Sequence, residues 1–140
     1  MPLELQIIRA REFLRLGAQG AFDFTSAREV LKTLADACHK RGIERALVDV
    51  RGSTSNLTPG EWAELVSALR DVGFSPRLRL AVLHTGNQEY RAKLFASISA
   101  MRGWTVSAFE EFDYGNDVNG SSLTNYRITN EIEWNWVNSL

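Results

Sequence analysis

The chain has 140 residues, of which 44% are hydrophobic and 24% are charged, and its formal net charge is −1. That length fits one domain that can bury a core without disulfides or a structural metal. A near-neutral charge argues against nucleic-acid binding, which needs a basic surface. The single cysteine cannot form an internal disulfide, and we find neither a membrane-spanning run nor a signal peptide. We therefore expect a cytoplasmic protein that binds neither nucleic acid nor membranes.

The first two predicted elements are short apolar strands at residues 3–10 and 13–18, separated by the charged pair Arg11-Glu12. Two such segments with a short connection favour an antiparallel hairpin. A unit of helix, glycine and apolar strand then repeats three times. Helices that alternate with continuously apolar strands predict right-handed crossovers and a mainly parallel sheet, so the fold class is α/β.

Each predicted helix has recognisable start or stop signals. The first is expected to begin at Ser26, with Glu29 completing a capping box, and the second at Thr58, with Pro59 at its first position and Glu61 closing the box. The third runs from about residue 89 to residue 101. Apolar stripes mark the buried faces of the helices, and Cys38 lies on the stripe of the first as a small core residue. The strands that follow the helices are predicted at residues 46–50, 78–83 and 104–109.

The composition changes near Phe112. Residues 1–112 carry a net charge of +2, whereas residues 113–140 carry −3 and contain six asparagines and two of the four tryptophans. Residues 113–123 are rich in Gly, Asn and Ser and are expected to form a loop. In the tail, Ile132, Trp134 and Trp136 alternate with polar residues, which is typical of a strand. Such a strand could pair across a homodimer through these three side chains, or the two tryptophans could simply cover one flank of the domain.

Signatures of catalytic, nucleotide-binding or metal-binding sites are absent from the sequence. It contains no phosphate-binding glycine loop, no nucleophile elbow, no H-E-x-x-H and no C-x-x-C pair. We therefore predict no cofactor, no metal, no catalytic residues and no enzymatic activity.

Polar side chains nevertheless gather at the carboxyl ends of the predicted strands, where open α/β sheets bind ligands. Asp49, Arg51 and His84 are the candidates for a small-ligand or enzymatic site. In a catalytic arrangement His84 would act as a general base, oriented by Asp49, with a serine as nucleophile. The alternative is that Asp49 and His84 satisfy backbone groups in turns.

The loop before the second helix contains three hydroxyl groups, those of Ser53, Ser55 and Thr58. Capping alone explains Thr58, because its side chain accepts a hydrogen bond from the first turn. A phosphate would also be stabilised at a helix N-terminus, so the three residues are candidates for a phosphorylation switch that controls partner binding.

Two strands followed by three helix–strand units, with an aspartate ending the strand before a capped helix, resemble a STAS domain of the anti-anti-sigma (SpoIIAA-like) family. The resemblance covers about residues 3–112. It rests on the segments Ala46-Leu-Val-Asp-Val-Arg51, Thr58-Pro-Gly-Glu-Trp62, Leu80-Ala-Val-Leu83 and Arg102-Gly-Trp-Thr-Val106.

This sequence departs from the family pattern at two places. Phosphorylated members carry Asp-Ser-Ser-Gly at the start of the helix, whereas Leu57 and Thr58 stand near those positions here. Family members also usually end with a helix packed on the sheet, in the place of residues 113–140. The chain is more similar to uncharacterised bacterial STAS-like proteins that lack the phosphorylation motif.

The resemblance implies a STAS-like domain at residues 1–112, with residues 113–140 as an atypical loop and strand-like tail of the same domain. It also implies a non-enzymatic regulatory module that binds a protein partner through residues 52–60, in a bacterial signalling or sigma-factor-type circuit. A small-ligand or enzymatic site at the strand ends is the alternative function.

Overall fold

The computed structural model describes residues 4–10, 13–110, 133 and 135–139, with side chains from Phe13 onward. No helix in this part of the chain is both long enough and apolar enough to cross a membrane. The elements, in chain order, are β1 (Glu4–Ala10), β2 (Phe13–Phe22), α1 (Phe24–Arg41), β3 (Arg45–Ser55), α2 (Pro59–Ser67), β4 (Arg79–His84), the 3-10 helix η1 (Gly86–Gln88), α3 (Glu89–Met101) and β5 (Thr105–Glu110).

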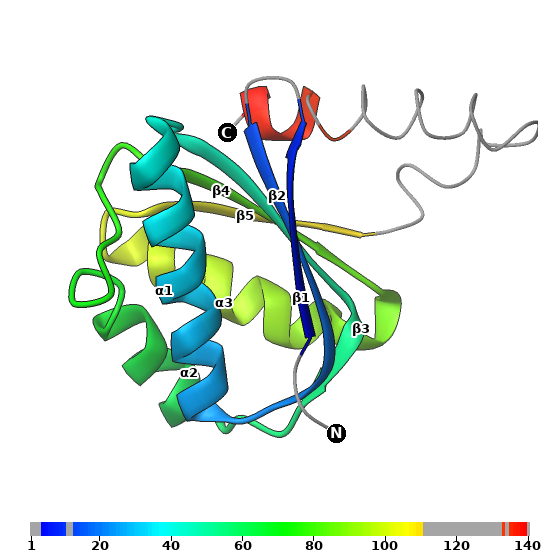
Figure 1. The fold of residues 1–140 in the computed structure, drawn as a ribbon. Coiled ribbons are helices and arrows are strands. Elements are labelled where there is room, and N and C mark those ends of the chain that lie inside the picture. The colour runs from blue at the N-terminus through cyan, green and yellow to red at the C-terminus, as the bar shows by residue number, and fades with distance from the viewer. Residues whose placement is uncertain (1–3, 11–12, 111–132, 134, 140) are drawn as a thin grey trace, which may run out of the picture.

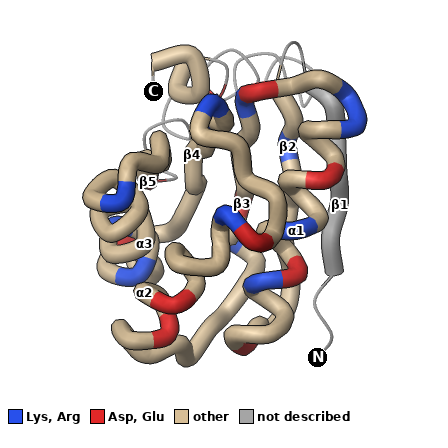
Figure 2. The backbone as a smooth tube through the Cα atoms, turned by 90° about the vertical axis from the view of Figure 1, so that its left-hand side faces the viewer, with Lys and Arg blue, Asp and Glu red and all other residues tan. Residues whose placement is uncertain are grey.

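The five strands form one sheet in the order β1-β2-β3-β4-β5. β1 pairs with β2 in antiparallel register, from Glu4 opposite Gln19 to Ala10 opposite Phe13. The pairs β2–β3, β3–β4 and β4–β5 are parallel. The sheet is therefore mainly parallel, as the alternation of helices and strands predicts. All three α-helices cover the same face of the sheet, as Figures 1 and 2 show from two directions.

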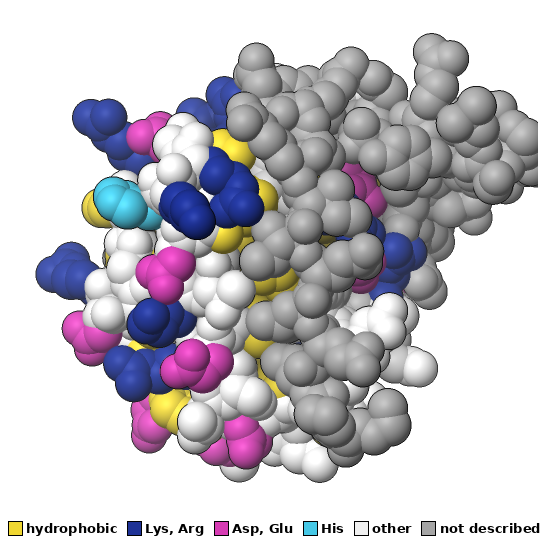
Figure 3. Space-filling model, viewed as in Figure 1, with side chains coloured by type: hydrophobic (Ala, Val, Ile, Leu, Met, Phe, Trp, Pro, Cys, Tyr) yellow, Lys and Arg dark blue, Asp and Glu magenta, His cyan; other side chains and the backbone are white. Residues whose placement is uncertain are grey.

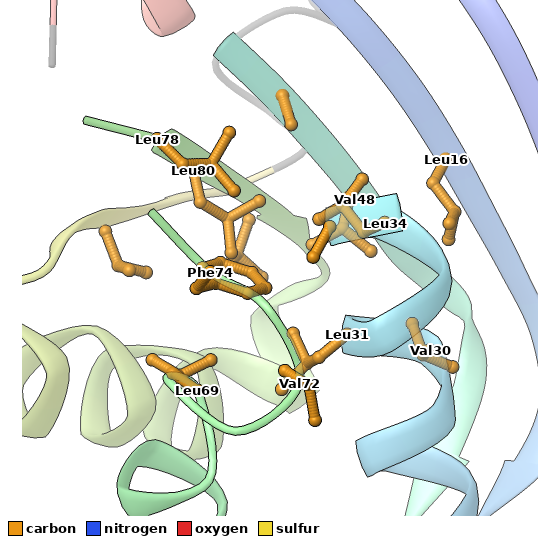
Figure 4. Packing of buried hydrophobic residues seen from close by; sticks show 14 of the residues in the cluster. Leu16, Val30, Leu31, Leu34, Val48, Leu69, Val72, Phe74, Leu78 and Leu80 are labelled. Carbon is orange, nitrogen blue, oxygen red and sulfur yellow. The ribbon is translucent and has the colours of Figure 1, made fainter. Parts of the chain in front are cut away.

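The main hydrophobic core lies between that face and the helices. Val30, Leu31 and Leu34 of α1 are buried in this core. Leu34 lies beside Val48 of β3, whereas Leu31 lies beside Val72 (Figure 4). Side chains two residues apart along a strand share a face, so alternate positions of each strand enter this core. The outer surface of the helices instead carries basic and acidic side chains interspersed (Figure 3).

Helix α1 begins earlier than its sequence predicts. Asp23 is the N-cap, and its carboxylate accepts a hydrogen bond of 2.9 Å from the backbone N–H of Ser26, whose hydroxyl accepts one of 2.9 Å from the N–H of Asp23. The predicted start at Ser26 with Glu29 is therefore wrong. Ser26 serves as the second member of a capping box one turn earlier, a role that Glu or Gln fills more often.

Helix α2 begins as predicted and ends before its apolar stripe does. Thr58 Oγ1 accepts from the Glu61 N–H at 3.2 Å, and Glu61 Oε1 accepts from the Thr58 N–H at 3.0 Å. The helix ends at Ser67, although its apolar stripe continues through Leu69 and Val72, both of which are buried. The N–H of Leu69 bonds to the carbonyl three residues back, so the chain tightens into turns while keeping the same side inward.

Helix α3 has the predicted bounds but a different inner face. Its buried residues are Ala92, Phe95 and Ser99, whereas Met101, an apolar residue at the predicted end of the helix, is 85% exposed. Met101 is the last residue of the helix, so it extends past the sheet into solvent.

The opposite face of the sheet carries a second, smaller core and contacts the end of the chain. It consists of Phe13, Leu47, Ala81, Leu83 and Val137, with Phe109 and Trp136 packed against it. Residues 133 and 135–139 are helical, so the predicted strand is wrong for this part of the tail. Glu133, Trp136 and Val137 contact the sheet at spacings of three and four residues, which is a helical pattern. The predicted loop at residues 113–123 lies outside the described residues.

Candidate functional site

A cavity of about 710 Å³ lies between the carboxyl-terminal part of the sheet and the three helices. Such a volume is within the usual range for small-molecule sites. Its strand residues include Ala18, Val48 and Val82, which alternate onto the helix-covered face. Its helix residues come from α1, α2 and α3, so the cavity lies where all the layers of the fold meet. This is the edge at which open α/β sheets bind ligands.

Three aromatic rings form one wall of the cavity. Trp62 of α2 lies edge-on to Phe22 with ring centroids 6.4 Å apart, and its centroid is 5.9 Å from that of Phe95 in α3. Such aromatic contacts hold the rings in fixed orientations. The Trp62 Nε1 donor is buried and has no hydrogen-bond partner among the described residues. The wall is therefore mostly apolar, with one buried donor in it.

Gln88 fixes the mouth of the cavity. Its Nε2 donates to the carbonyl oxygens of Val50 at 2.7 Å and Ser53 at 2.9 Å, and its Oε1 accepts from the Thr85 N–H at 2.9 Å. One side chain thus ties the end of β3 to the segment that follows β4. These three hydrogen bonds therefore link the two strand ends at the mouth of the cavity.

The mouth itself is lined by polar side chains and by two arginines. The lining residues of this kind are Arg51, Ser53, Thr54, Ser55, Asn56, Thr85, Asn87, Gln88 and Arg91. No aspartate or glutamate of the described ranges lines the cavity. The site therefore offers an apolar interior, hydrogen-bonding groups at its mouth and positive rather than negative charge.

Asp49 lies outside this cavity, in an ion-pair cluster. Its carboxylate accepts hydrogen bonds from Arg15 Nη2 at 2.7 Å, from Arg51 Nε and Nη2 at 2.9 and 2.8 Å, and from the Arg51 N–H at 3.0 Å. Arg15 Nε also donates to Glu133 Oε1 at 3.0 Å. Burial raises the pKa of Asp49, but the hydrogen bonds from Arg51 outweigh it, and the net pKa lies below its usual range. Its partners make Asp49 a structural anion.

His84 is almost fully buried at 1% exposure and does not line the cavity. Its Nδ1 lies 2.8 Å from the carbonyl oxygen of Thr85, and its Nε2 has no hydrogen-bond partner in the part of the chain that the structure describes. Asp49 lies opposite Leu83 in the β3–β4 register. His84 follows Leu83, so its side chain lies on the face of the sheet opposite to that of Asp49. The structure therefore does not form the Asp49–His84 pair that a catalytic arrangement would need.

Two of the three candidate switch hydroxyls belong to the cavity. Ser53 is buried, and its Oγ donates to the Val50 carbonyl at 2.7 Å, while Ser55 is half-buried at the mouth. Thr58 is exposed and caps α2. Of the candidate interface residues, Ile132 and Trp134 lie outside the described residues. Trp136 stacks on Phe109 with ring centroids 5.0 Å apart.

Neither a metal site nor a reactive thiol is evident in the described ranges. No group of three or more His, Cys, Asp or Glu residues there could hold a metal ion. Cys38 is buried, and burial raises the pKa of its thiol to about 11, so its nucleophilic thiolate is scarce near neutral pH.

The sequence placed its candidates at the edge of the sheet where this cavity lies, but it did not identify all of the residues that line the cavity. Arg51, Ser53 and Ser55 were candidates and do line the cavity, whereas Asp49 and His84 do not. Gln88 and Arg91 were missed. The spacing Thr85-Gly-Asn-Gln88 after a strand, which matches a capping box, was the available signal for Gln88.

Comparison with known proteins gives little further information about function. No protein-family model matches the sequence, and a search of curated proteins finds no match. Among solved structures, the chain is similar to an uncharacterized protein from the DUF3478 family with a SpoIIAA-like fold from Shewanella loihica. The sequences are 18% identical, the match covers 79% of this chain and 89% of the other, and the TM-score is 0.48.

Proposed function

We propose that this protein binds a small amphipathic molecule in the cavity between the sheet and the helices, without chemical conversion. The cavity of about 710 Å³, with an apolar interior and a polar mouth, is the observation that carries the proposal. Binding sites for small molecules combine these same features. The apolar part of the ligand would lie against Phe22, Trp62 and Phe95, and its polar part would face the mouth.

The absence of an assembled catalytic group among the described residues supports binding without conversion. A general base must itself lie within hydrogen-bonding reach of the proton that it takes from the substrate. His84 and Asp49, the strongest candidates, are engaged with Thr85 and with two arginines, and neither lines the cavity.

Binding of a protein partner is the second candidate function. Residues 54–56 line the cavity and continue into the exposed start of α2 at residues 58–60. A regulatory partner, of the kind that a STAS-like module would have, could contact this surface. Affinity capture with the full chain as bait, beside a Thr58→Glu variant, tests this role. A stoichiometric protein captured by the wild type and lost with the variant supports it, and no such protein counts against it.

Native mass spectrometry and ligand titration test the cavity proposal. We expect 1-decanol and decanoate, two ten-carbon probes, to bind the wild-type protein with a stoichiometry of one. The Ala92→Leu and Ala27→Leu variants place extra side-chain volume in the cavity wall and should weaken binding at least tenfold. Two variants on different helices guard against a folding defect in either.

Ala100→Leu is the matched control, because Ala100 is an exposed residue of α3 that does not line the cavity. It should bind both probes as the wild type does. Wild-type protein that binds neither probe, or cavity variants that bind as well as Ala100→Leu, would contradict the proposal.

A further inference from the structure

The charges at the mouth of the cavity differ in how they are compensated. Two arginines, Arg51 and Arg91, are among the residues that line the cavity. Arg51 is a double donor to the carboxylate of Asp49, at 2.9 and 2.8 Å. Its charge is therefore already paired within the fold. The remaining question is which group compensates the charge of Arg91.

Arg91 is an exposed residue in the first turn of α3 and has no hydrogen bond or ion pair with any residue that the structure describes. Its neighbour Ala92 and the residue one turn later, Phe95, also line the cavity. Residues at spacings of three and four lie on one side of a helix, so Arg91 stands at the rim of the same apolar surface. Arg91 thus lies beside the cavity, and its side chain is exposed.

The acidic side chains near this rim interact with Lys93, another cationic residue of α3. Glu89 pairs with Lys93 at 2.6 Å, and Glu110 also interacts favourably with Lys93. Glu110 approaches the rim closely, since its Oε1 lies 2.9 Å from where a Cβ on Gly86 would be. It nevertheless does not line the cavity. Lys93 is therefore compensated by two carboxylates, and none of the described residues that line the cavity beside Arg91 is acidic.

We propose that the ligand of the cavity is an amphipathic organic anion whose carboxylate or phosphate head binds the guanidinium of Arg91 while its apolar body fills the interior. A guanidinium presents parallel N–H donors that match the two oxygens of such a head, and charge-assisted hydrogen bonds are stronger than neutral ones. This inference rests on the proposed function, since it specifies the ligand of the same cavity.

Titration with three ten-carbon probes tests the inference: decanoate, decyl phosphate and 1-decanol. Because Arg91 is exposed, its contribution is modest, and we expect at least one anion to bind the wild-type protein about fivefold more tightly than 1-decanol. The Arg91→Gln variant should lose this preference, because its affinity for the anion should fall much more than its affinity for 1-decanol. Which anion is preferred distinguishes a carboxylate head from a phosphate head.

Arg70→Gln is the matched control, because it removes the same charge from an exposed arginine that does not line the cavity. It should keep the wild-type preference. Equal affinities for the three probes, or equal losses in Arg91→Gln and Arg70→Gln, overturn the inference and leave the proposed function standing. If none of the probes binds the wild-type protein, the inference and the proposed function fail together.

Discussion

Asp49 is the residue whose role differs most from what its position in the sequence indicates. An aspartate near the end of a buried strand favours a ligand or catalytic role, but here two arginines occupy both of its carboxylate oxygens. Its side chain is 13% exposed, so the ion pairs are largely shielded from water. Removal of one partner from such a cluster leaves the others uncompensated.

The Asp49→Asn variant should therefore be destabilised, by about 2–3 kcal/mol. Urea denaturation at pH 7 measures this loss, and probe binding in the cavity should persist in conditions where the variant is folded. The stabilising effect should also depend on pH. Because the pKa of Asp49 is lowered in the folded state, its contribution is present above the pKa of the unfolded chain and is lost as pH falls through the folded value. An unchanged unfolding midpoint at pH 7 would contradict this role.

The pKa of Glu133 is shifted in the opposite direction to that of Asp49. Its side chain is 1% exposed, its Oε2 has no hydrogen-bond partner among the described residues, and burial raises its pKa even though Arg15 pulls it down. A carboxyl group whose pKa is raised on folding disfavours the folded state when it ionises. The destabilisation by Glu133 therefore appears as pH rises above the pKa of this residue in the unfolded chain. It is complete above its pKa in the folded protein.

We therefore predict that Glu133→Gln gains stability relative to the wild type as pH rises from about 4 to 7. The measurement is the free energy of unfolding in urea for both proteins at several pH values. Glu64→Gln is the matched control, because it makes the same change at an exposed residue of α2. A difference between wild type and Glu133→Gln that stays constant with pH would refute the prediction.

At the scale of elements, the start of α2 shows how far local chemistry determines structure. Thr58, Pro59 and Glu61 predict its first turn, and the structure has both reciprocal hydrogen bonds. Thr58→Ala should lower the free energy of unfolding by about 1 kcal/mol, because a backbone donor loses its acceptor. Thr58→Ser retains a hydroxyl and should cost much less. Equal stability of the alanine and serine variants in urea denaturation would argue against the capping role.

Elements whose contacts are local were predictable from sequence, and those determined by tertiary contacts were not. The periodicity predicted the parallel sheet and the bounds of α3, because each depends on a regular apolar pattern. The prediction of a strand in the tail was wrong because Trp134 and Trp136 are two residues apart, which is the spacing of side chains on one face of a strand. The residues that contact the sheet include a charged one, Glu133, which an apolar pattern does not reveal. Its ion pair with Arg15 links positions 118 residues apart, which no local pattern reveals.

The same limit applies to the candidate site. Parallel strands bring their carboxyl ends together, so the sequence could indicate this edge of the sheet. It could not show that Arg51 turns toward Asp49, or that three aromatic rings from β2, α2 and α3 leave a cavity beside them. Pairing of the tail in a homodimer stays a prediction, and light scattering on the full chain tests it.

At the scale of the whole molecule, the sheet has two unlike faces. The helix-covered face contains the large core and the cavity, and the other face carries the small core that contacts the end of the chain. Under the proposed function, the ligand binds on the helix-covered face, while the other face packs against the end of the chain. This proposal can be tested on both faces at once, because each contains methyl-bearing residues.

Methyl NMR spectra recorded during a titration with decanoate test this central claim most directly. Shifts are expected in the cavity residues Val30, Leu31, Val48, Leu65 and Val82. Leu47, Leu83 and Val137 on the other face should change little. Saturable shifts confined to the cavity residues are the predicted result. Shifts confined to the other face, or none at all, would contradict the account.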